Sequence, residues 1–310
     1  MYISLVVLLY AIWTFCFPIG KYTLNFCPPV FLTGIRMLLG GAIIISFLFF
    51  KRRNDLKIYG SQIVPLFLLG IFSTYLTNIC EFWALSTELT ASKVCFIYSL
   101  SPFMAALLSY IHFKERMNRM KWLGMTIGLI GMIPGIVING GSKDFFSSVS
   151  LAELSMVGAS FFTVYGWVLL RLLVKDNQLS PLTANSYSML IGGGLALIHS
   201  FFIDNWTPIP VAAGHFFPFA KGILAMTFIS NILCYNLYGY LLKRFTATFM
   251  SFMGLVSPFF ASFTSWLILG EKIQVEIFYS MIIIIFGLWL VYREELKQGY
   301  IQKKSVSTAS

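Results

Sequence analysis

The chain has 310 residues, of which 58% are hydrophobic and 11% charged, with a formal net charge of +10 and a mean hydropathy of +0.80. Soluble domains carry about a quarter charged residues, so this composition excludes an ordinary soluble enzyme or binding domain and indicates an integral membrane protein. The positive charges lie mainly between apolar runs, which favours loops that orient helices in a membrane over a surface for nucleic acid. We expect contact with membrane lipid and none with nucleic acid.

Ten apolar segments are each long enough to cross about 30 Å of hydrocarbon as a helix. Lipid offers no partner for open strand edges, so the spans are predicted to be helices. The first segment has no basic region and no cleavage pattern, and is predicted to be a span rather than a removable signal. The ten predicted spans are 2–20, 30–50, 62–84, 91–112, 121–139, 151–172, 181–203, 218–242, 247–269 and 275–293. Residues 294–310 are predicted to form a cytoplasmic polar tail.

The first two spans each carry an unusual residue. Pro18 lies inside span 1, where it removes a backbone hydrogen bond and makes this position a candidate hinge. Arg36 lies about six residues into span 2, at a depth where charge is costly. Two interpretations of Arg36 stay open. It binds a carboxylate or phosphate of a substrate, or it is a structural ion pair or a snorkelling arginine.

Span 3 carries an ionisable residue, Glu81, in the sequence Asn-Ile-Cys-Glu-Phe-Trp that begins at Asn78. A charge there costs about 2.5–3.5 kcal/mol on insertion scales and usually faces a cavity or a partner. Glu81 is therefore either a carboxylate that recognises a cation or accepts a proton, or a glutamate at headgroup level that is exposed to water, since Glu88 follows closely.

Aromatic residues make up 17% of the chain. Most aromatic side chains of membrane proteins face lipid or the interface, but those inside spans 1, 3, 4, 6 and 8 are placed to line a cavity. There they would stack on a flat ring or contact an onium group. Asparagines inside helices are costly unless satisfied, so some of them should face inward. The candidate cavity residues, including the charged ones, are Trp13, Phe17, Arg36, Tyr75, Asn78, Glu81, Trp83, Tyr98, Tyr165, Trp167, Asn185, Asn231, Tyr235 and Tyr238.

A repeat sets the expected architecture. The sequence Ser-Pro-Phe that contains Pro102 recurs 156 residues later around Pro258, and a glutamate follows each proline at the same distance, Glu115 and Glu271. Matches in one register extend over about fifty residues. The two prolines are candidate hinges of two gates or purely architectural kinks, and we favour structural roles for the two glutamates.

Two halves of five spans follow from the repeat, residues 1–139 and 151–293. Because five is odd, the second half must cross the membrane upside down, which gives two inverted repeats around a central cavity. Most of the 22 Lys and Arg residues fall on one side when the N-terminus is placed in the cytoplasm. This bias predicts that both termini are cytoplasmic.

The two copies resemble the tandem EamA-type domains of the drug/metabolite transporter superfamily. The resemblance rests on Thr-Ala at 90 and 246, on Ser-Pro-Phe at 101 and 257, and on the following glutamates, and it covers about residues 1–293. Thr14 departs from the family, which often has glycine after the span-1 tryptophan. The resemblance implies ten helices, with spans 5 and 10 outside the central cavity, and the movement of small organic solutes across a bacterial inner (plasma) membrane.

We therefore expect a secondary transporter without cofactor or metal, working by exchange or proton coupling. The residue types favour a flat or cationic nucleoside-like solute such as S-adenosylmethionine. The alternatives are an amino-acid or drug exporter of the same fold and a multi-span enzyme acting on lipids. No P-loop and no His-Glu-x-x-His sequence is present. The glycines of span 5, including Gly124 and Gly128, either pack within the chain or form a seam between two copies.

Overall fold

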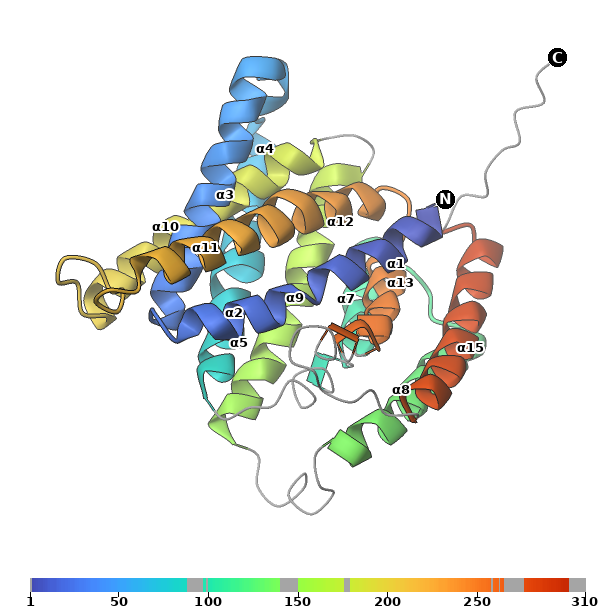
Figure 1. The fold of residues 1–310 in the computed structure, drawn as a ribbon. Helices are drawn as coiled ribbons and strands as arrows, with labels where there is room; N and C mark the ends of the chain where they lie inside the picture. The colour runs from blue at the N-terminus through green and yellow to red at the C-terminus, as the bar shows by residue number, and fades with distance from the viewer. Residues whose placement is uncertain are drawn as a thin grey trace.

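The computed structural model describes residues 2–87, 97–98, 100–139, 150–175, 179–257, 259–261, 263–264 and 276–300, without the side chains of 132–139, 276–278 and 280. The regular structure of these residues is entirely helical (Figure 1), as expected. The elements are α1 (Tyr2–Trp13), α2 (Cys16–Leu24), α3 (Pro29–Lys51), η1 (Arg53–Leu56), α4 (Gly60–Leu69), η2 (Gly70–Leu76), α5 (Thr77–Ser86), α7 (Ser101–Phe113), α8 (Arg119–Asn139), α9 (Leu151–Val174), α10 (Pro181–Ile203), α11 (Phe216–Met226), η4 (Thr227–Cys234), α12 (Tyr235–Leu242), α13 (Ala247–Met253), η5 (Gly254–Val256) and α15 (Glu276–Lys297).

Six helical stretches within the described residues are long and apolar enough to cross a membrane. They are Tyr2–Leu24, Pro29–Lys51, Gly60–Ser86, Leu151–Val174, Pro181–Ile203 and Phe216–Leu242. The other four expected spans overlap α7, α8, α13 and α15 and fall partly on residues or side chains outside the description. α15 continues to Lys297, so the first residues of the expected tail are helical.

The first span is interrupted between α1 and α2. Pro18 has no N–H to donate to Thr14, and its ring would clash with the carbonyl of that residue in a continuous helix. Thr14 and Phe15 accordingly form the break between the two helices, with the Thr14 hydroxyl donating to the Ala11 carbonyl at 2.8 Å. The break lies beside the predicted hinge.

Two spans contain a π-helical turn, η2 between α4 and α5 and η4 between α11 and α12. An asparagine amide satisfies a carbonyl of each turn five residues earlier. Asn78 Nδ2 donates to the Ser73 carbonyl at 3.2 Å, and Asn236 Nδ2 donates to the Asn231 carbonyl at 3.2 Å. Turns of this kind are rare and occur frequently at functional sites.

α8 and α15 pack along each other at one edge of the molecule (Figure 1). A Cβ atom added to Gly124 would meet the Gly287 carbonyl oxygen at 2.8 Å, and one added to Gly287 would meet the Gly124 carbonyl oxygen at 2.5 Å. Only glycine permits this approach at both positions. The span-5 glycine Gly124 therefore packs within the chain.

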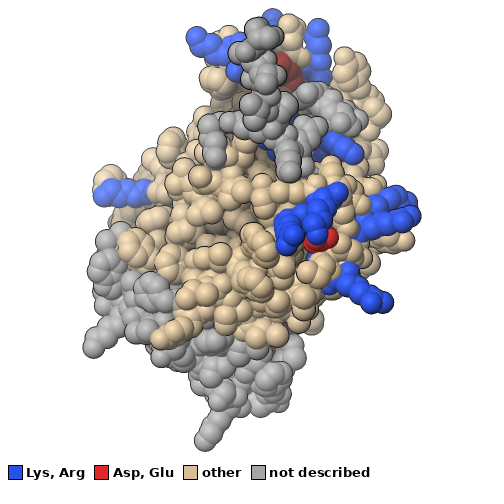
Figure 2. All heavy atoms as spheres, turned by 90° about the vertical axis from the view of Figure 1, so that its right-hand side faces the viewer, with Lys and Arg blue, Asp and Glu red and all other residues tan. Residues whose placement is uncertain are grey.

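Figure 2 views this edge and shows a surface largely without charge at its centre and toward the lower left, with most Lys and Arg side chains toward the top and the right of the view. Large apolar side chains of α8 and α15 are exposed on it. They include Trp122, Leu123, Ile130, Ile282, Ile285, Phe286 and Trp289. Such a surface suits lipid tails.

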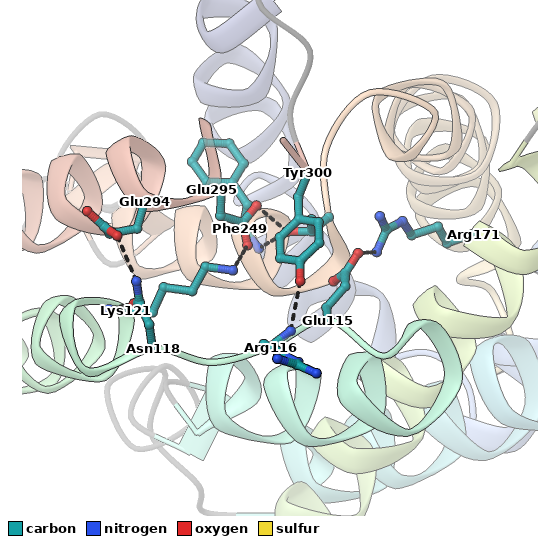
Figure 3. A network of polar contacts seen from close by, with 10 residues as sticks. Glu115, Arg116, Asn118, Lys121, Arg171, Phe249, Glu294, Glu295 and Tyr300 are labelled. Atoms are coloured by element: carbon teal, nitrogen blue, oxygen red, sulfur yellow. Dashed lines mark hydrogen bonds and ion pairs between the residues drawn. The ribbon is translucent and has the colours of Figure 1, made fainter. Parts of the chain in front are cut away.

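A cluster of charges, mostly buried, lies on α8, α9 and α15 and on the residues that precede α8 and α13, and we call it the ionic network (Figure 3). Lys121 Nζ lies 3.1 Å from Glu295 Oε1, with side chains 1% and 0% exposed. The Thr246 hydroxyl donates to the other oxygen of Glu295 at 2.6 Å. Arg171 Nη1 lies 2.6 Å from Glu115 Oε1.

The outer part of the ionic network is built on Glu294. Asn118 Nδ2 donates to Glu294 Oε2 at 2.7 Å, and Lys297 Nζ lies 2.6 Å from Glu294 Oε1. Tyr300 lies beside this cluster in Figure 3, and its hydroxyl accepts from the Arg116 backbone N–H at 2.9 Å. The network joins residues from both halves of the sequence.

Candidate functional site

A large cavity lies among α1, α2, α3, α5, α9, α12 and α13, with an empty volume of about 1050 Å³ that includes space open to solvent. Its mixture of apolar and polar walls is that of a small-molecule site. Eight of the predicted residues line it: Trp13, Phe17, Arg36, Asn78, Glu81, Tyr98, Trp167 and Tyr235.

Aromatic side chains from three helices form one wall of the cavity. The rings of Trp13 and Tyr235 have centroids 5.5 Å apart. The ring of Trp167 stacks on that of Tyr238, with centroids 4.6 Å apart. Rings that are held in place by other rings offer flat faces to a planar or cationic ligand at low entropic cost.

Arg36 brings a buried positive charge to the cavity, since its side chain is only 2% exposed. Its Nη2 atom donates to Asn78 Oδ1, and its guanidinium lies over the Phe82 ring at 5.0 Å. The buried Nε atom has no hydrogen-bond partner. Among the described residues, no carboxylate lies within ion-pair distance of Arg36.

Glu81 brings a negative charge to the same cavity. The Tyr98 hydroxyl donates to Glu81 Oε2 at 2.5 Å. No hydrogen bond to Oε1 comes from the part of the chain that the structure describes. Because Glu81 follows Asn78 by three residues on α5, the two side chains share one face of the helix.

Hydroxyl groups complete the lining and were not among the predicted residues. The additional lining residues are Tyr10, Thr14, Cys16, Ser73, Thr77, Phe82, Ser101, Thr163, Ser230, Ser251, Gly254, Leu255 and Ser257. Two of them bond each other, Thr163 with Thr77 at 3.2 Å, and Ser101 bonds Ser160 outside the lining at 2.9 Å. Serines and threonines inside apolar runs were a usable signal for them.

The remaining predicted cavity residues lie outside the lining. The Tyr75 hydroxyl is 3.0 Å from His199 Nδ1, and Trp83 is exposed on α5. The Tyr165 ring contacts Phe72 at 4.8 Å.

Two amides and one tyrosine of the predicted set are also enclosed by neighbouring helices. Asn185 Nδ2 donates to the Tyr235 carbonyl at 2.8 Å, and Asn231 Nδ2 lies 2.9 Å from the sulfur of Met37. Tyr238 is buried behind the rings of Trp13 and Trp167. Asparagine in an apolar helix needs a partner, and neighbouring helices supply one to the Nδ2 atom of each of these two residues.

The three predicted hinges fall in different settings. Pro18 follows the break between α1 and α2, and its neighbour Phe17 lines the cavity. Pro102 is the second residue of α7, where its missing N–H leaves no helical hydrogen bond unmade. Pro258 lies outside the described residues.

The arrangement of the cavity suits the binding and enclosure of a ligand. An aromatic wall, one cation and one anion with unused hydrogen-bonding capacity, and a ring of hydroxyls suit a polar organic solute with a flat ring. Within the described residues, no group of three His, Cys, Asp or Glu side chains is placed to hold a metal ion.

Comparison with known proteins identifies related chains. The model of the EamA-like transporter family matches residues 1–134 and again residues 150–293. A protein of Chlamydia muridarum (strain MoPn / Nigg), named S-adenosylmethionine/S-adenosylhomocysteine transporter, is 37% identical over 94% of this chain and 91% of its own length. The protein of the same name from Chlamydia trachomatis serovar L2 is 38% identical over 94% of this chain and 88% of its own length.

More distant relatives carry less specific names. A protein of Buchnera aphidicola subsp. Schizaphis graminum, named an uncharacterized transporter, is 24% identical over 87% of this chain and 84% of its own length. A solved crystal structure superposes with a TM-score of 0.72 at 14% identity, covering 95% of this chain and 96% of its own. At that identity the likeness shows a shared fold alone.

Proposed function

Because the chain belongs to the EamA-like transporter family, and is therefore a transporter rather than an enzyme, we propose that its cargo is S-adenosylmethionine and S-adenosylhomocysteine. The observation that carries this proposal is the identity of 37% over 94% of the chain with a protein named for these two solutes. The cavity supports it, because aromatic rings suit the adenine and the charged side chains suit the polar remainder.

The proposed mechanism is alternating access between two inverted repeats of five helices, 1–139 and 151–293. Two observations support it. The family model matches twice along the chain, and the π-helical turns begin at Gly70 and Thr227, a spacing close to that of the sequence repeat. The ten-helix count, the cytoplasmic placement of both termini and the inner-membrane location belong to this proposal, as do the cavity roles of the eight lining residues.

Transport by purified protein in liposomes tests the cargo. We expect labelled S-adenosylmethionine to enter, and to enter faster when the liposomes contain unlabelled S-adenosylhomocysteine, because a carrier that returns loaded exchanges one solute for the other. Uptake no greater than in protein-free liposomes would contradict the proposal. Ohmic flux without counter-transport would indicate a channel instead.

Labelling of introduced cysteines tests the inverted repeat. Positions 117 and 273 are equivalent in the two halves, so an impermeant reagent added to right-side-out vesicles should modify only one of them. Modification of both from the same side would contradict the inversion.

A further inference from the structure

Two opposite charges in the cavity are held near each other without pairing. Arg36 donates to Asn78, and Asn78 lies one turn before Glu81 on α5. Side chains with this spacing have Cβ atoms about 5–6 Å apart on one helix face. Glu81 is nevertheless not within ion-pair distance of Arg36 among the described contacts.

Arg36 has capacity left for an anion. Its guanidinium carries five N–H donors in a planar fork, of which Nη2 serves Asn78 while buried Nε has no partner. A buried cation without an anion costs several kcal/mol. A ligand carboxylate would remove this penalty, and its planar pair of oxygens matches the guanidinium fork.

Glu81 has matching capacity for a cation. Tyr98 occupies Oε2 at 2.5 Å, and a carboxylate has acceptor sites for further donors. The ammonium of an amino acid carries three donors and lies one carbon from its carboxylate. The pair of side chains therefore matches both ends of one zwitterion.

We propose that Arg36 and Glu81 together bind the α-carboxylate and the α-ammonium of the cargo, so that the carrier recognises the amino-acid end that S-adenosylmethionine and S-adenosylhomocysteine share, and not the sulfonium. The inference rests on the proposed function and deepens it. It assigns Asn78 and Tyr98 as positioning residues, because each holds one of the two charged groups.

Charge balance favours binding of the shared amino-acid end, rather than the sulfonium, by Arg36 and Glu81. A site that used Glu81 for the sulfonium alone would place that cation near the unpaired Arg36 guanidinium, and the repulsion would oppose binding. Binding of the zwitterion neutralises both side chains and leaves the sulfonium to the aromatic wall, where cation–π contact is sufficient. Such a site accepts the charged and the uncharged sulfur, as an exchanger of these two solutes must.

Competition by three thioethers tests the inference in the liposome assay. The competitors of labelled S-adenosylmethionine are S-adenosylhomocysteine, its analogue without the carboxylate and its analogue without the amino group. With wild-type protein we expect each truncated analogue to compete at least about tenfold more weakly than S-adenosylhomocysteine, as the loss of a hydrogen-bonded charge predicts. Equal competition by all three would overturn the inference.

Substitutions assign each end to its side chain. In Arg36→Gln the analogue without the carboxylate should compete as well as S-adenosylhomocysteine, while the analogue without the amino group should still compete more weakly. In Glu81→Gln the two analogues should exchange these results. Arg53→Gln, which removes an exposed arginine of η1 far from the cavity lining, should keep the wild-type ranking. A purely structural role of Arg36 and Glu81 would leave the ranking of competitors unchanged in every active variant and would overturn the assignment.

The outcomes separate the two proposals. Uptake of S-adenosylmethionine with equal competition by the three thioethers removes the zwitterion site and leaves the proposed function standing. Absence of uptake by wild-type protein overturns the proposed function and this inference together. If one variant does not fold, the wild-type ranking and the other variant decide.

Discussion

The cavity and the ionic network both bury charge, but they satisfy it differently. In the ionic network, Lys121 and Glu295 face each other at 3.1 Å, and Thr246 occupies the second oxygen of the carboxylate. In the cavity, Arg36 and Glu81 each bond one neutral side chain among the described residues, and Arg36 Nε has no partner. Burial within an ion pair, as for Lys121 and Glu295, is typical of a structural site, whereas burial of a charge without an ion-pair partner at an open space is typical of a binding site.

Breaking the ionic network should give the largest loss of stability. Lys121→Met leaves Glu295 buried without its cation, which should lower the free energy of unfolding by about 3–5 kcal/mol. The double variant Lys121→Met/Glu295→Leu should recover most of this loss, because the uncompensated charge is gone. Thermal unfolding in detergent measures both. A double variant at least as unstable as Lys121→Met alone would contradict the pairing.

Packing near the ionic network should be the next most sensitive. A Cβ added to Gly128 would lie 2.6 Å from a ring carbon of Phe252, so Gly128→Ala should destabilise by about 1–3 kcal/mol through overpacking. Gly194→Ala on α10 is the matched control, because nothing lies within 4 Å of its Cβ position. There the better helix propensity of alanine should stabilise by about 0.5–1 kcal/mol. The same unfolding assay would contradict the assignment if both substitutions changed stability in one direction.

Removal of the cavity charge should cost much less stability than removal of Lys121. Arg36→Met eliminates a buried cation with an unsatisfied Nε, and this gain offsets the loss of the hydrogen bond to Asn78 Oδ1, so we expect stability to change by less than about 1 kcal/mol while uptake falls at least about tenfold. Thermal unfolding and liposome uptake on one preparation separate the effects. A loss of stability comparable to that of Lys121→Met would show that Arg36 is structural.

The exposed end of the ionic network should give the smallest effect, visible through pH. A hydrogen bond from Lys297, with a second from Asn118, holds the pKa of Glu294 below its usual range. A lowered carboxyl pKa stabilises the fold above the unfolded pKa, and this contribution is lost as pH falls through the folded pKa. Lys297 is 57% exposed, so Lys297→Gln should cost less than about 1 kcal/mol. The difference in melting temperature from wild type should disappear in acid, and a difference that grows there would contradict this sign.

More of the charged and polar cavity residues than of the buried ion pairs could be predicted from the sequence. Arg36, Asn78 and Glu81 were predictable because each is polar within an apolar run, where a cavity or a partner is needed. The family resemblance and the expectation of a transporter are confirmed by the family match. The all-helical fold is confirmed within the described residues.

Partners that are distant in sequence were not predictable. Glu115 was assigned a structural role, but nothing in the sequence pointed to Arg171, which lies on another helix. Glu295 was assigned to a polar tail, because a charged residue after an apolar run looks like the end of a span. It is instead fully buried against Lys121. Local composition carries no information on which loop or helix covers a residue.

The π-helical turn η2 determines the direction in which the side chains of α5 point. An α-helix turns by about 100° per residue, and a π-helical turn accommodates one residue more than an α turn. Deletion of one residue from η2 would therefore rotate Asn78 and Glu81 about 100° around the axis of α5 relative to α4, away from Arg36 and Tyr98. The extra residue of η2 thus determines the direction in which Glu81 points from α5. A span shortened by one residue would remain apolar, helical and membrane-embedded, but Glu81 would contact different neighbours.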